Sequence, residues 1–456
     1  MLQAKLQDIK PQNFFVIIAL AFGLLYVFIT PIFQGPDEPS HFFTISRYGN
    51  GNLTPYLSEG KITINTHEGV IQRYDNYPGQ AGRTSKVGYF DNLNTITSIV
   101  IGDFRSGSKQ ITSSVYPPFN YIHFIVVYFI GAVLKLSPFL LFLSLRLVGL
   151  ITWISLIYFA IKLIPRAKWL VTVFALLPMS LFVGSIVGAD SLVNALVFLI
   201  IALITKAIVQ PTSLTKKYWV VLLGLIILLG LTKQTFFVVS LLLFALPRPK
   251  YVKKISWVLL ISAIFILTAS FAIGWQILVS PYTSIPFENV SPSSQLRLII
   301  EKPIWFGRVL WNTYLTTYSS QLYIGFIGVL GWLNISLPVW ITGGWLALII
   351  SSLNSGIQKT KVRLSKFQKL LFIFVALTLA GLLTVALYLV WTPVGAGVVN
   401  GLQGRYFIPI IAILLPLFIL NRTEPTGNRK VIIVFGIIIL HIATFLTYIS
   451  HYIQIL

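Results

Sequence analysis

The chain alternates long apolar runs with short polar connections over almost its whole length. A run of ~20 apolar residues is long enough for a helix to cross a bilayer. This pattern predicts an all-α polytopic membrane protein that forms a single transmembrane domain over residues 1–456. The approximate bounds of the apolar runs are 13–33, 119–134, 139–162, 168–187, 189–208, 218–231, 233–247, 255–279, 332–353, 367–391, 406–420 and 430–450.

The composition agrees with this pattern, since 56% of the residues are hydrophobic, 10% are charged and the mean hydropathy is +0.84. Lys5 and Lys10 precede the first apolar run, as they would in a signal peptide. The run lacks a small-residue cleavage site, so we expect a retained first transmembrane helix. Cysteine is absent, which excludes disulfides, thiolate metal sites and a cysteine nucleophile.

The formal net charge of +22 comes from lysines and arginines that gather in the short connections. The positive-inside rule places such connections in the cytoplasm, next to anionic lipid. We do not expect nucleic acid as a partner, because the basic residues line short membrane loops rather than one soluble face. The clusters include Lys162, Arg166 and Lys168; Lys206, Lys216 and Lys217; Arg248, Lys253 and Lys254; Arg363, Lys366 and Lys369; and Arg422, Arg429 and Lys430.

The runs at 119–134 and 139–162 cannot both cross the membrane, because the basic cluster at 162–168 would then face outward. We expect 119–134 to lie along the outer surface, since it is short and follows Tyr116-Pro117-Pro118. About eleven transmembrane helices result, with the N-terminus inside and the C-terminus outside. Long outer loops follow at 34–138, which contains juxtamembrane helices, and at 280–331. Ten of the 12 acidic residues then lie outside, where we expect the active site.

The first outer loop opens with two adjacent acids, Asp37 and Glu38, followed by His41. Pro36 and Pro39 bracket the acids and oppose a regular helix through them. A carboxylate beside a membrane is costly unless it is used, paired or hydrated. The structural alternative for Asp37 is a helix cap, and that for His41 is a hydrogen-bonded bystander. The two acids and His41 could also hold a divalent cation, although no spacing here is diagnostic of a metal site.

Two cations at the outer ends of predicted helices are candidate phosphate ligands. Arg405 follows Gly401 and Gly404, which would let the backbone approach a ligand closely, and a guanidinium can hold a phosphate with two parallel hydrogen bonds. Lys233 lies at the turn between two short apolar runs. For both residues the structural alternative is a side chain that extends to the lipid headgroups.

Three further residues have a structural and a functional interpretation. Arg146 lies inside an apolar run, where we expect it to pair with an outer acid. Asp190 starts a predicted helix and acts either as its cap or as a ligand of substrate or metal. Trp332 fits an interfacial aromatic belt, and a sugar-stacking role is the alternative.

These motifs resemble the GT-C superfamily of membrane glycosyltransferases, and more closely an uncharacterised bacterial multi-span family related to it. The resemblance covers nearly the whole chain and is most specific at its first and last motifs. At Asn334 this chain departs from that family, many of whose members have Asp. The matching pieces are residues 33–41, 116–119, 145–147, 177–178, 188–191, 231–233, 331–334 and 403–407.

The resemblance implies a fold and a function. It implies transfer of a sugar from a polyprenyl-phosphate donor to a cell-envelope glycan or polymer on the outer membrane face. Asp37 would be the base that accepts the acceptor proton, with Glu38 as the substitute, while Arg405 and Tyr406 would bind substrate. The competing hypothesis is a transporter or flippase of lipid-linked sugars, which would require charges deep in several helices and internal repeats.

Overall fold

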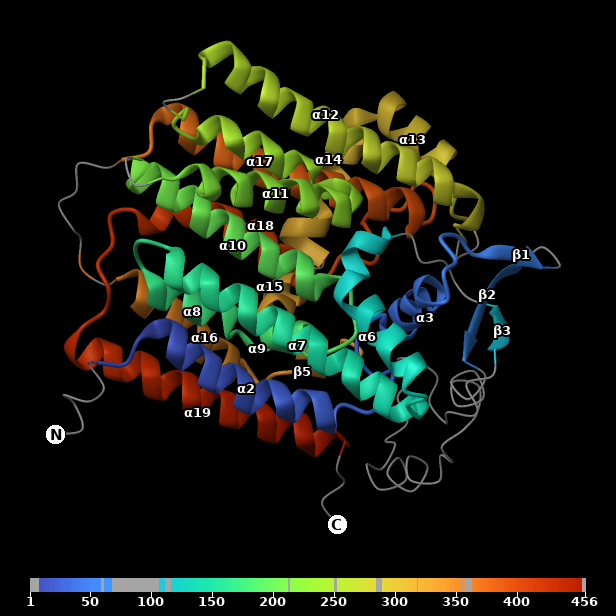
Figure 1. The fold of residues 1–456 in the computed structure, drawn as a ribbon, viewed down its shortest axis with the longest axis horizontal. Helices are drawn as coiled ribbons and strands as arrows, with labels where there is room; N and C mark the ends of the chain where they lie inside the picture. Colours follow the sequence, from blue (N-terminus) through green and yellow to red (C-terminus); the bar gives the residue numbers. More distant parts are fainter. Residues whose placement is uncertain are drawn as a thin grey trace.

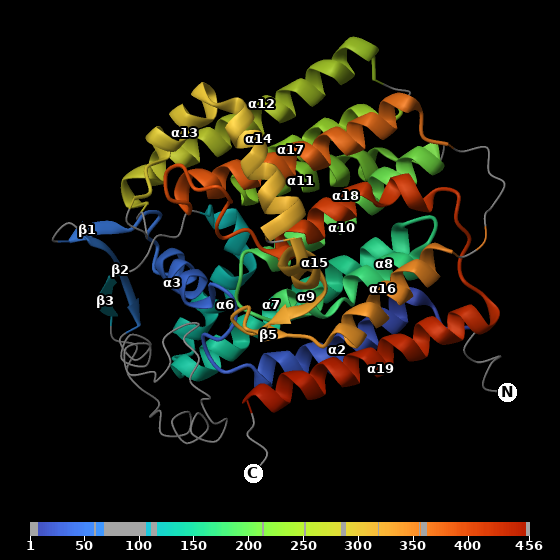
Figure 2. The same cartoon turned by 180° about the vertical axis from the view of Figure 1, so that it is seen from behind.

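The computed structural model describes residues 8–58, 61–67, 106–110, 116–211, 214–249, 252–283, 289–317, 319–354, 356 and 363–452. Six helices in this part of the chain are long and apolar enough to cross a membrane, and they run side by side in Figures 1 and 2. The prediction of a polytopic, mainly α-helical membrane protein is therefore confirmed. These helices are α2 (Pro11–Ile29), α7 (Pro138–Leu163), α10 (Asp190–Val209), α12 (Lys254–Val279, prolonged by the short η4, Ser280–Tyr282), α17 (Lys366–Val390) and α19 (Gly427–Tyr452).

Shorter apolar helices occupy the remaining predicted runs, so the number of eleven membrane crossings stays a prediction. One of these runs is broken where Pro178 opens a new helix, because proline cannot donate the hydrogen bond that would continue the preceding one. The shorter helices are α8 (Lys168–Ala175), α9 (Pro178–Gly184), α11 (Lys216–Thr232), η3 (Gln234–Ala245, a 3-10 helix), α16 (Val339–Leu353) and α18 (Phe407–Ile419).

The two ends of the helix bundle differ in the chemistry of their connections. At one end the Lys430 ammonium donates to the backbone oxygen of Ile9, and the Glu424 carboxylate accepts from the backbone N–H groups of Lys168 and Trp169. The starts of α2, α8 and α19 therefore meet among the basic connections. The starts of α3 (Glu38–Gly49), α10 and α18 meet at the opposite end.

The first long loop contains strands as well as helices. Strand β1 (Tyr56–Ser58) pairs antiparallel with β2 (Lys61–His67), which pairs antiparallel with β3 (Ser106–Gln110). We expected juxtamembrane helices in this loop, and its strands were not predicted. Strand β2 reads Ile-Thr-Ile-Asn-Thr, and such β-branched residues favour a strand. The rest of the middle of the loop, 68–105 and 111–115, lies outside the described residues.

The loop returns to the bundle through η1 (Pro118–Tyr121) and α6 (Ile122–Val133). In Figures 1 and 2, α6 runs across the long helices rather than along them. Ile122, Phe129 and Val133 are about half exposed or more, as lipid-facing side chains would be. This arrangement agrees with the expected surface helix, and its failure to cross the membrane stays a prediction.

The second long loop forms a layer of short helices over the end of the bundle that carries α3. The layer also supports the segment before Arg405: Gln295 accepts from the backbone N–H of Gly395, and Thr313 accepts from that of Val399. Its elements are α13 (Pro292–Glu301), α14 (Pro303–Trp311), the π-helical turn η5 (Asn312–Thr317), α15 (Ser319–Gly328) and the two-residue strands β4 (Val329–Leu330) and β5 (Ile335–Ser336).

Candidate functional site

Four separate elements bring charged side chains together at the end of the bundle that carries α3. Asp37 directly precedes α3, and Asp190 is the first residue of α10. Lys233 lies between α11 and η3, and Arg405 lies in the 3-10 turn η6 (Gly404–Tyr406) that leads into α18. All four residues were candidate site residues from the sequence, and the structure brings them into one cluster.

Arg405 is the centre of this cluster, with only 4% of its side chain exposed. Its Nη2 donates to Oδ2 of Asp37 at 2.5 Å, and its Nη1 lies 3.6 Å from Oδ2 of Asp190. Its Nε donates to Oε1 of Gln403 at 2.6 Å. All three guanidinium nitrogens therefore face an oxygen of the protein, and two of those oxygens carry negative charge.

Lys233 is the second cation of the cluster, and it lies between two aromatic rings. Its ammonium lies 3.2 Å from Oδ1 of Asp190, 5.0 Å from the centre of the Tyr116 ring and 5.5 Å from that of Tyr406. A cation held over aromatic faces is stabilised by the ring quadrupoles. Asp190 thus bridges Lys233 and Arg405. The capping role considered from sequence is wrong, because Asp190 is the first residue within α10, Ala189 occupies the cap position and no side chain caps the helix.

Tyr116 is a site residue that the sequence analysis missed. It appeared there only as the first residue of a Tyr-Pro-Pro motif. Its ring stacks at 25° on that of His41, and its backbone oxygen accepts from the Tyr48 hydroxyl. The signal that could have identified it is its position directly before two prolines, which fix the chain as it returns to the bundle.

His41 lies beneath the cluster and is buried, with 7% of its surface exposed. Its Nδ1 is 2.7 Å from the hydroxyl of Tyr121. Burial lowers the pKa of His41 to about 4, although the nearby carboxylates of Asp37 and Asp190 act in the opposite direction. His41 is therefore neutral at pH 7 and adds no charge to the cluster.

The two adjacent acids have different surroundings because the backbone turns between them. Asp37 has a left-handed conformation, with φ of 59°, which Asp adopts more easily than most residues. Glu38 then begins α3, and Pro39 occupies the first turn, where proline is well tolerated. As a result, 45% of the Asp37 side chain is exposed, while Glu38 is completely buried.

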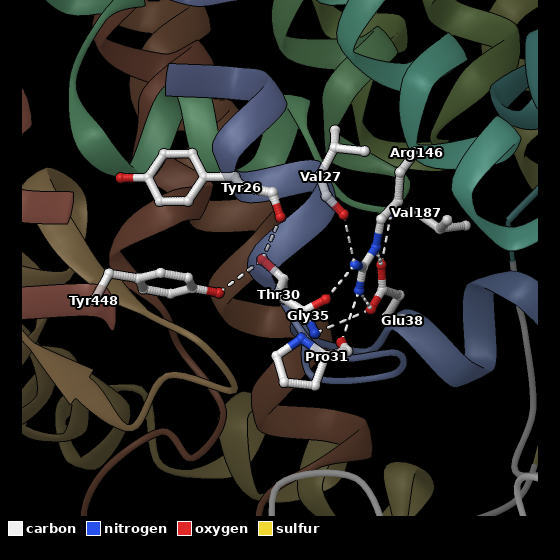
Figure 3. A network of polar contacts seen from close by, with 9 residues as sticks. All are labelled: Tyr26, Val27, Thr30, Pro31, Gly35, Glu38, Arg146, Val187 and Tyr448. Atoms are coloured by element: carbon white, nitrogen blue, oxygen red, sulfur yellow. Dashed lines mark hydrogen bonds and ion pairs between the residues drawn. The ribbon is translucent and has the colours of Figure 1, made fainter. Parts of the chain in front are cut away.

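Glu38 forms a buried ion pair with Arg146 of α7, as Figure 3 shows. Nε and Nη2 of Arg146 donate to the two carboxylate oxygens at 2.8 and 2.7 Å. The remaining guanidinium hydrogens reach the backbone oxygens at the end of α2, those of Val27, Thr30 and Pro31. Arginine has five N–H donors, and all five are engaged. The expectation that Arg146 pairs with an acid is confirmed, and the acid is Glu38 of the first long loop.

The Glu38 carboxylate is saturated as well. Its Oε1 accepts from the backbone N–H of Val187, and its Oε2 accepts from that of Gly35. The same end of α2 is linked to α19, because the Thr30 hydroxyl lies 2.7 Å from that of Tyr448. This network joins α2, α3, α7 and α19, and its groups face one another rather than a ligand.

An apolar groove reaches the start of α18, directly after the turn that carries Arg405. It is a cavity of about 410 Å³ between α15, α16 and α18. Phe407, which directly follows Tyr406, is one of its lining residues, together with Tyr314, Leu322, Leu346 and Ile411. The buried cation Arg405 in η6 and the groove-lining residue Phe407 at the start of α18 therefore lie within three consecutive residues.

Trp332 lies in the turn between β4 and β5. In the same turn, Nδ2 of Asn334 lies 3.4 Å from Nε2 of His451 on α19. The contacts that the structure describes do not join Trp332 to Arg405 or Asp37. Over the described ranges, no three His, Asp and Glu side chains are grouped so that they could hold a metal ion.

The fold and the cluster define a polytopic membrane protein with an ion-paired polar site at one end of its helix bundle. The model of the DUF2142 family, described as predicted membrane proteins, matches residues 20–414, and the chain belongs to this family. No curated protein and no solved structure matches the chain.

Proposed function

We propose that this protein is a glycosyltransferase of the GT-C type. It transfers a sugar from a polyprenyl-phosphate donor to a cell-envelope glycan or polymer on the extracytoplasmic face. The observation that carries this proposal is the half-exposed carboxylate of Asp37, held against the buried guanidinium of Arg405 beside an apolar groove. Such a reaction needs a base, a side chain that binds the donor phosphate and an apolar groove for the lipid chain.

Each part has a defined role in the transfer. The acceptor hydroxyl oxygen forms a bond to the anomeric carbon of the donor sugar, and its proton passes to Asp37. The bond from that carbon to the donor phosphate breaks, and the lipid phosphate departs with the electron pair. Arg405 and Lys233 stabilise the charge that develops on this phosphate. The apolar groove holds the first part of the polyprenyl chain, because an apolar chain gains free energy when it leaves water.

The competing function is transport of a lipid-linked sugar. It would use ionisable groups inside several helices as a pathway. Within the described residues, Arg146 is such a group, but Glu38 and three backbone oxygens engage all its donors. This saturation favours the enzyme over the transporter.

The test is turnover by the purified full-length protein, supplied with defined polyprenyl-phosphate sugars and cell-envelope glycans, with products identified by mass spectrometry. We expect sugar transfer that Arg405→Ala abolishes and Arg405→Lys reduces, since lysine lacks the planar fork. Arg297→Ala is the matched control, because Arg297 is 78% exposed and pairs with Glu301 on the surface of α13. Full turnover in Arg405→Ala would refute the phosphate role. Movement of the lipid across vesicles without transfer would support the transporter.

The side of the membrane can be tested separately. The chain has no cysteine, so a single introduced cysteine is the only labelling site. A cysteine in place of Lys135, at the end of α6, should react with an impermeant reagent added outside intact cells. Labelling only from the cytoplasm would reverse the proposed orientation of the site.

A further inference from the structure

Arg405, which we assign to the donor phosphate, already has partners within the protein. Nη2, Nη1 and Nε of Arg405 face Asp37, Asp190 and Gln403. With 4% of its side chain exposed, Arg405 offers no open side to a ligand. A phosphate can form two parallel hydrogen bonds with this guanidinium only if one of these groups moves away.

The charges of the cluster lead to the same conclusion. Asp37 and Asp190 carry two negative charges, Arg405 and Lys233 carry two positive charges, and His41 is neutral. The cluster is therefore balanced before any ligand binds. An anion that enters the cluster is attracted by its two cations and repelled by its two carboxylates. It gains a net attraction only when one carboxylate moves away from the cations.

Asp37 is the carboxylate that can leave. Its side chain is 45% exposed, so water can solvate it after it separates from Arg405. Asp190 is 14% exposed and also pairs with Lys233, so its departure would break two ion pairs in a buried place. Asp37 also directly precedes α3 and is not fixed within a helix.

We propose that Asp37 and the donor phosphate compete for Arg405, so that donor binding releases Asp37 to face the acceptor. This inference rests on the proposed function and adds an order of events to it. The carboxylate is held by the arginine while the site is empty of donor. It becomes free to accept a proton when the phosphate replaces it, and reaction with acceptor therefore requires that donor binds first.

Binding of a polyprenyl monophosphate to the purified full-length protein tests this competition. Removal of the Asp37 charge leaves the cluster with a net positive charge, so Asp37→Asn should bind this lipid about tenfold more tightly than the natural chain. Asparagine also tolerates the left-handed backbone at this position. Asp37→Gly suits the same backbone and removes the whole side chain, so it should tighten binding as well. Arg405→Ala should weaken binding at least tenfold.

Glu301→Gln is the matched control, since Glu301 is an exposed acid of α13, and its lipid affinity should stay unchanged. Inorganic phosphate is the second probe, and its binding should be weaker than that of the lipid but tightened by the same Asp37 variants. If the Asp37 variants bind inorganic phosphate more tightly but not the lipid, a free anion and not the lipid competes with Asp37, and the inference is overturned.

The outcomes separate this inference from the proposed function. If the natural chain binds the lipid through Arg405 and both Asp37 variants bind it equally or more weakly, the competition is refuted and the transferase proposal stands. If neither the natural chain nor Asp37→Asn binds the lipid, both fail. Initial rates give an independent check, because a pattern in which acceptor binds first would also overturn the order proposed here.

Discussion

Two ion pairs, formed by adjacent residues of one segment, differ in almost every physical property. Glu38 and Arg146 are 0% and 1% exposed, and all five guanidinium donors have acceptors. Asp37 and Arg405 form a pair that is open on the Asp37 side, which is 45% exposed. The left-handed turn at Asp37 separates the two carboxylates and directs them to different arginines.

The difference shows which pair can take part in chemistry. A saturated and dehydrated pair has no free donor or acceptor to offer a substrate, and separation of its charges inside the protein is costly. A half-exposed carboxylate can exchange its partner for water or for another ligand at much smaller cost. We therefore assign the Glu38–Arg146 pair to folding and the Asp37–Arg405 pair to function.

The largest effect is expected when the buried pair is broken. Arg146→Ala leaves the Glu38 charge buried without its partner and removes the hydrogen bonds that join α7 to the end of α2. Loss of one member of a buried pair typically costs about 3–5 kcal/mol. We expect little folded protein, measured as monodisperse yield in detergent and as thermal unfolding. A variant that folds with normal stability would contradict the structural role.

Substitution of both members sharpens this test. Glu38→Gln with Arg146→Met removes both charges and leaves no buried ion without a partner. Replacement of a buried pair by neutral groups is often close to neutral for stability, so the double variant should recover part of the loss. A double variant less stable than Arg146→Ala would show that the pair does not account for the effect.

The second effect concerns the open pair. Asp37→Asn keeps the size of the side chain and removes its basicity, so turnover should fall by about 10²–10⁴-fold, or roughly 3–5 kcal/mol of barrier. Stability should change little, because the carboxylate is half-exposed. Turnover with a defined acceptor is the measurement. Near-normal turnover in Asp37→Asn, with a folded Glu38→Gln inactive, would move the base to Glu38.

The four charged residues of the cluster were predicted from the sequence, but the pairs that they form with one another were not. Apolar runs give the helices directly, and basic connections give the end of the bundle at which the acids gather. Asp37, Asp190, Lys233 and Arg405 were each identified from a position at the end of an apolar run. Their convergence depends on contacts between residues up to 368 positions apart, such as Asp37 and Arg405, and no local pattern specifies such a contact.

The strands of the first loop and the role of Tyr116 show the same limit. The alternation of apolar and polar residues in β2 is short. The strand pairs with β3, which lies about forty residues further along the chain. Tyr116 gains its place from Lys233 and His41, which come from other elements. Local patterns therefore predict the elements, while packing decides which side chains share a site.

A third and smaller effect is expected from the backbone that carries Arg405. A Cβ on Gly404 would lie within 3.0 Å of backbone atoms of Leu322, Gly325 and Phe326 on α15. Gly404→Ala must therefore displace η6 or α15, and we expect turnover to fall at least tenfold because Arg405 moves with it. Gly325→Ala is the matched control, since its Cβ would meet Gly404 at 3.5 Å, an ordinary contact. Equal activity of the two variants would contradict this account.

The smallest effect tests the neutral histidine beneath the open pair. Burial lowers the pKa of His41 to about 4, whereas an unfolded histidine has a pKa of about 6.5. Between these values the unfolded chain binds a proton that the folded chain does not, so folding stability is lost as the pH falls below about 6.5. The loss is at most about 1.4 kcal/mol per pH unit.

His41→Gln removes this titration and keeps a side chain that can hydrogen-bond to Tyr121. Thermal unfolding of both proteins in detergent, from pH 8 to pH 4.5, isolates the contribution of His41 because the other titrating groups are common to both. The difference in Tm should be constant above pH 7 and should shift in favour of the variant below pH 6.5. Parallel curves over the whole range would mean that His41 has the same pKa in the folded and unfolded chain, which would contradict the lowering of its pKa by burial.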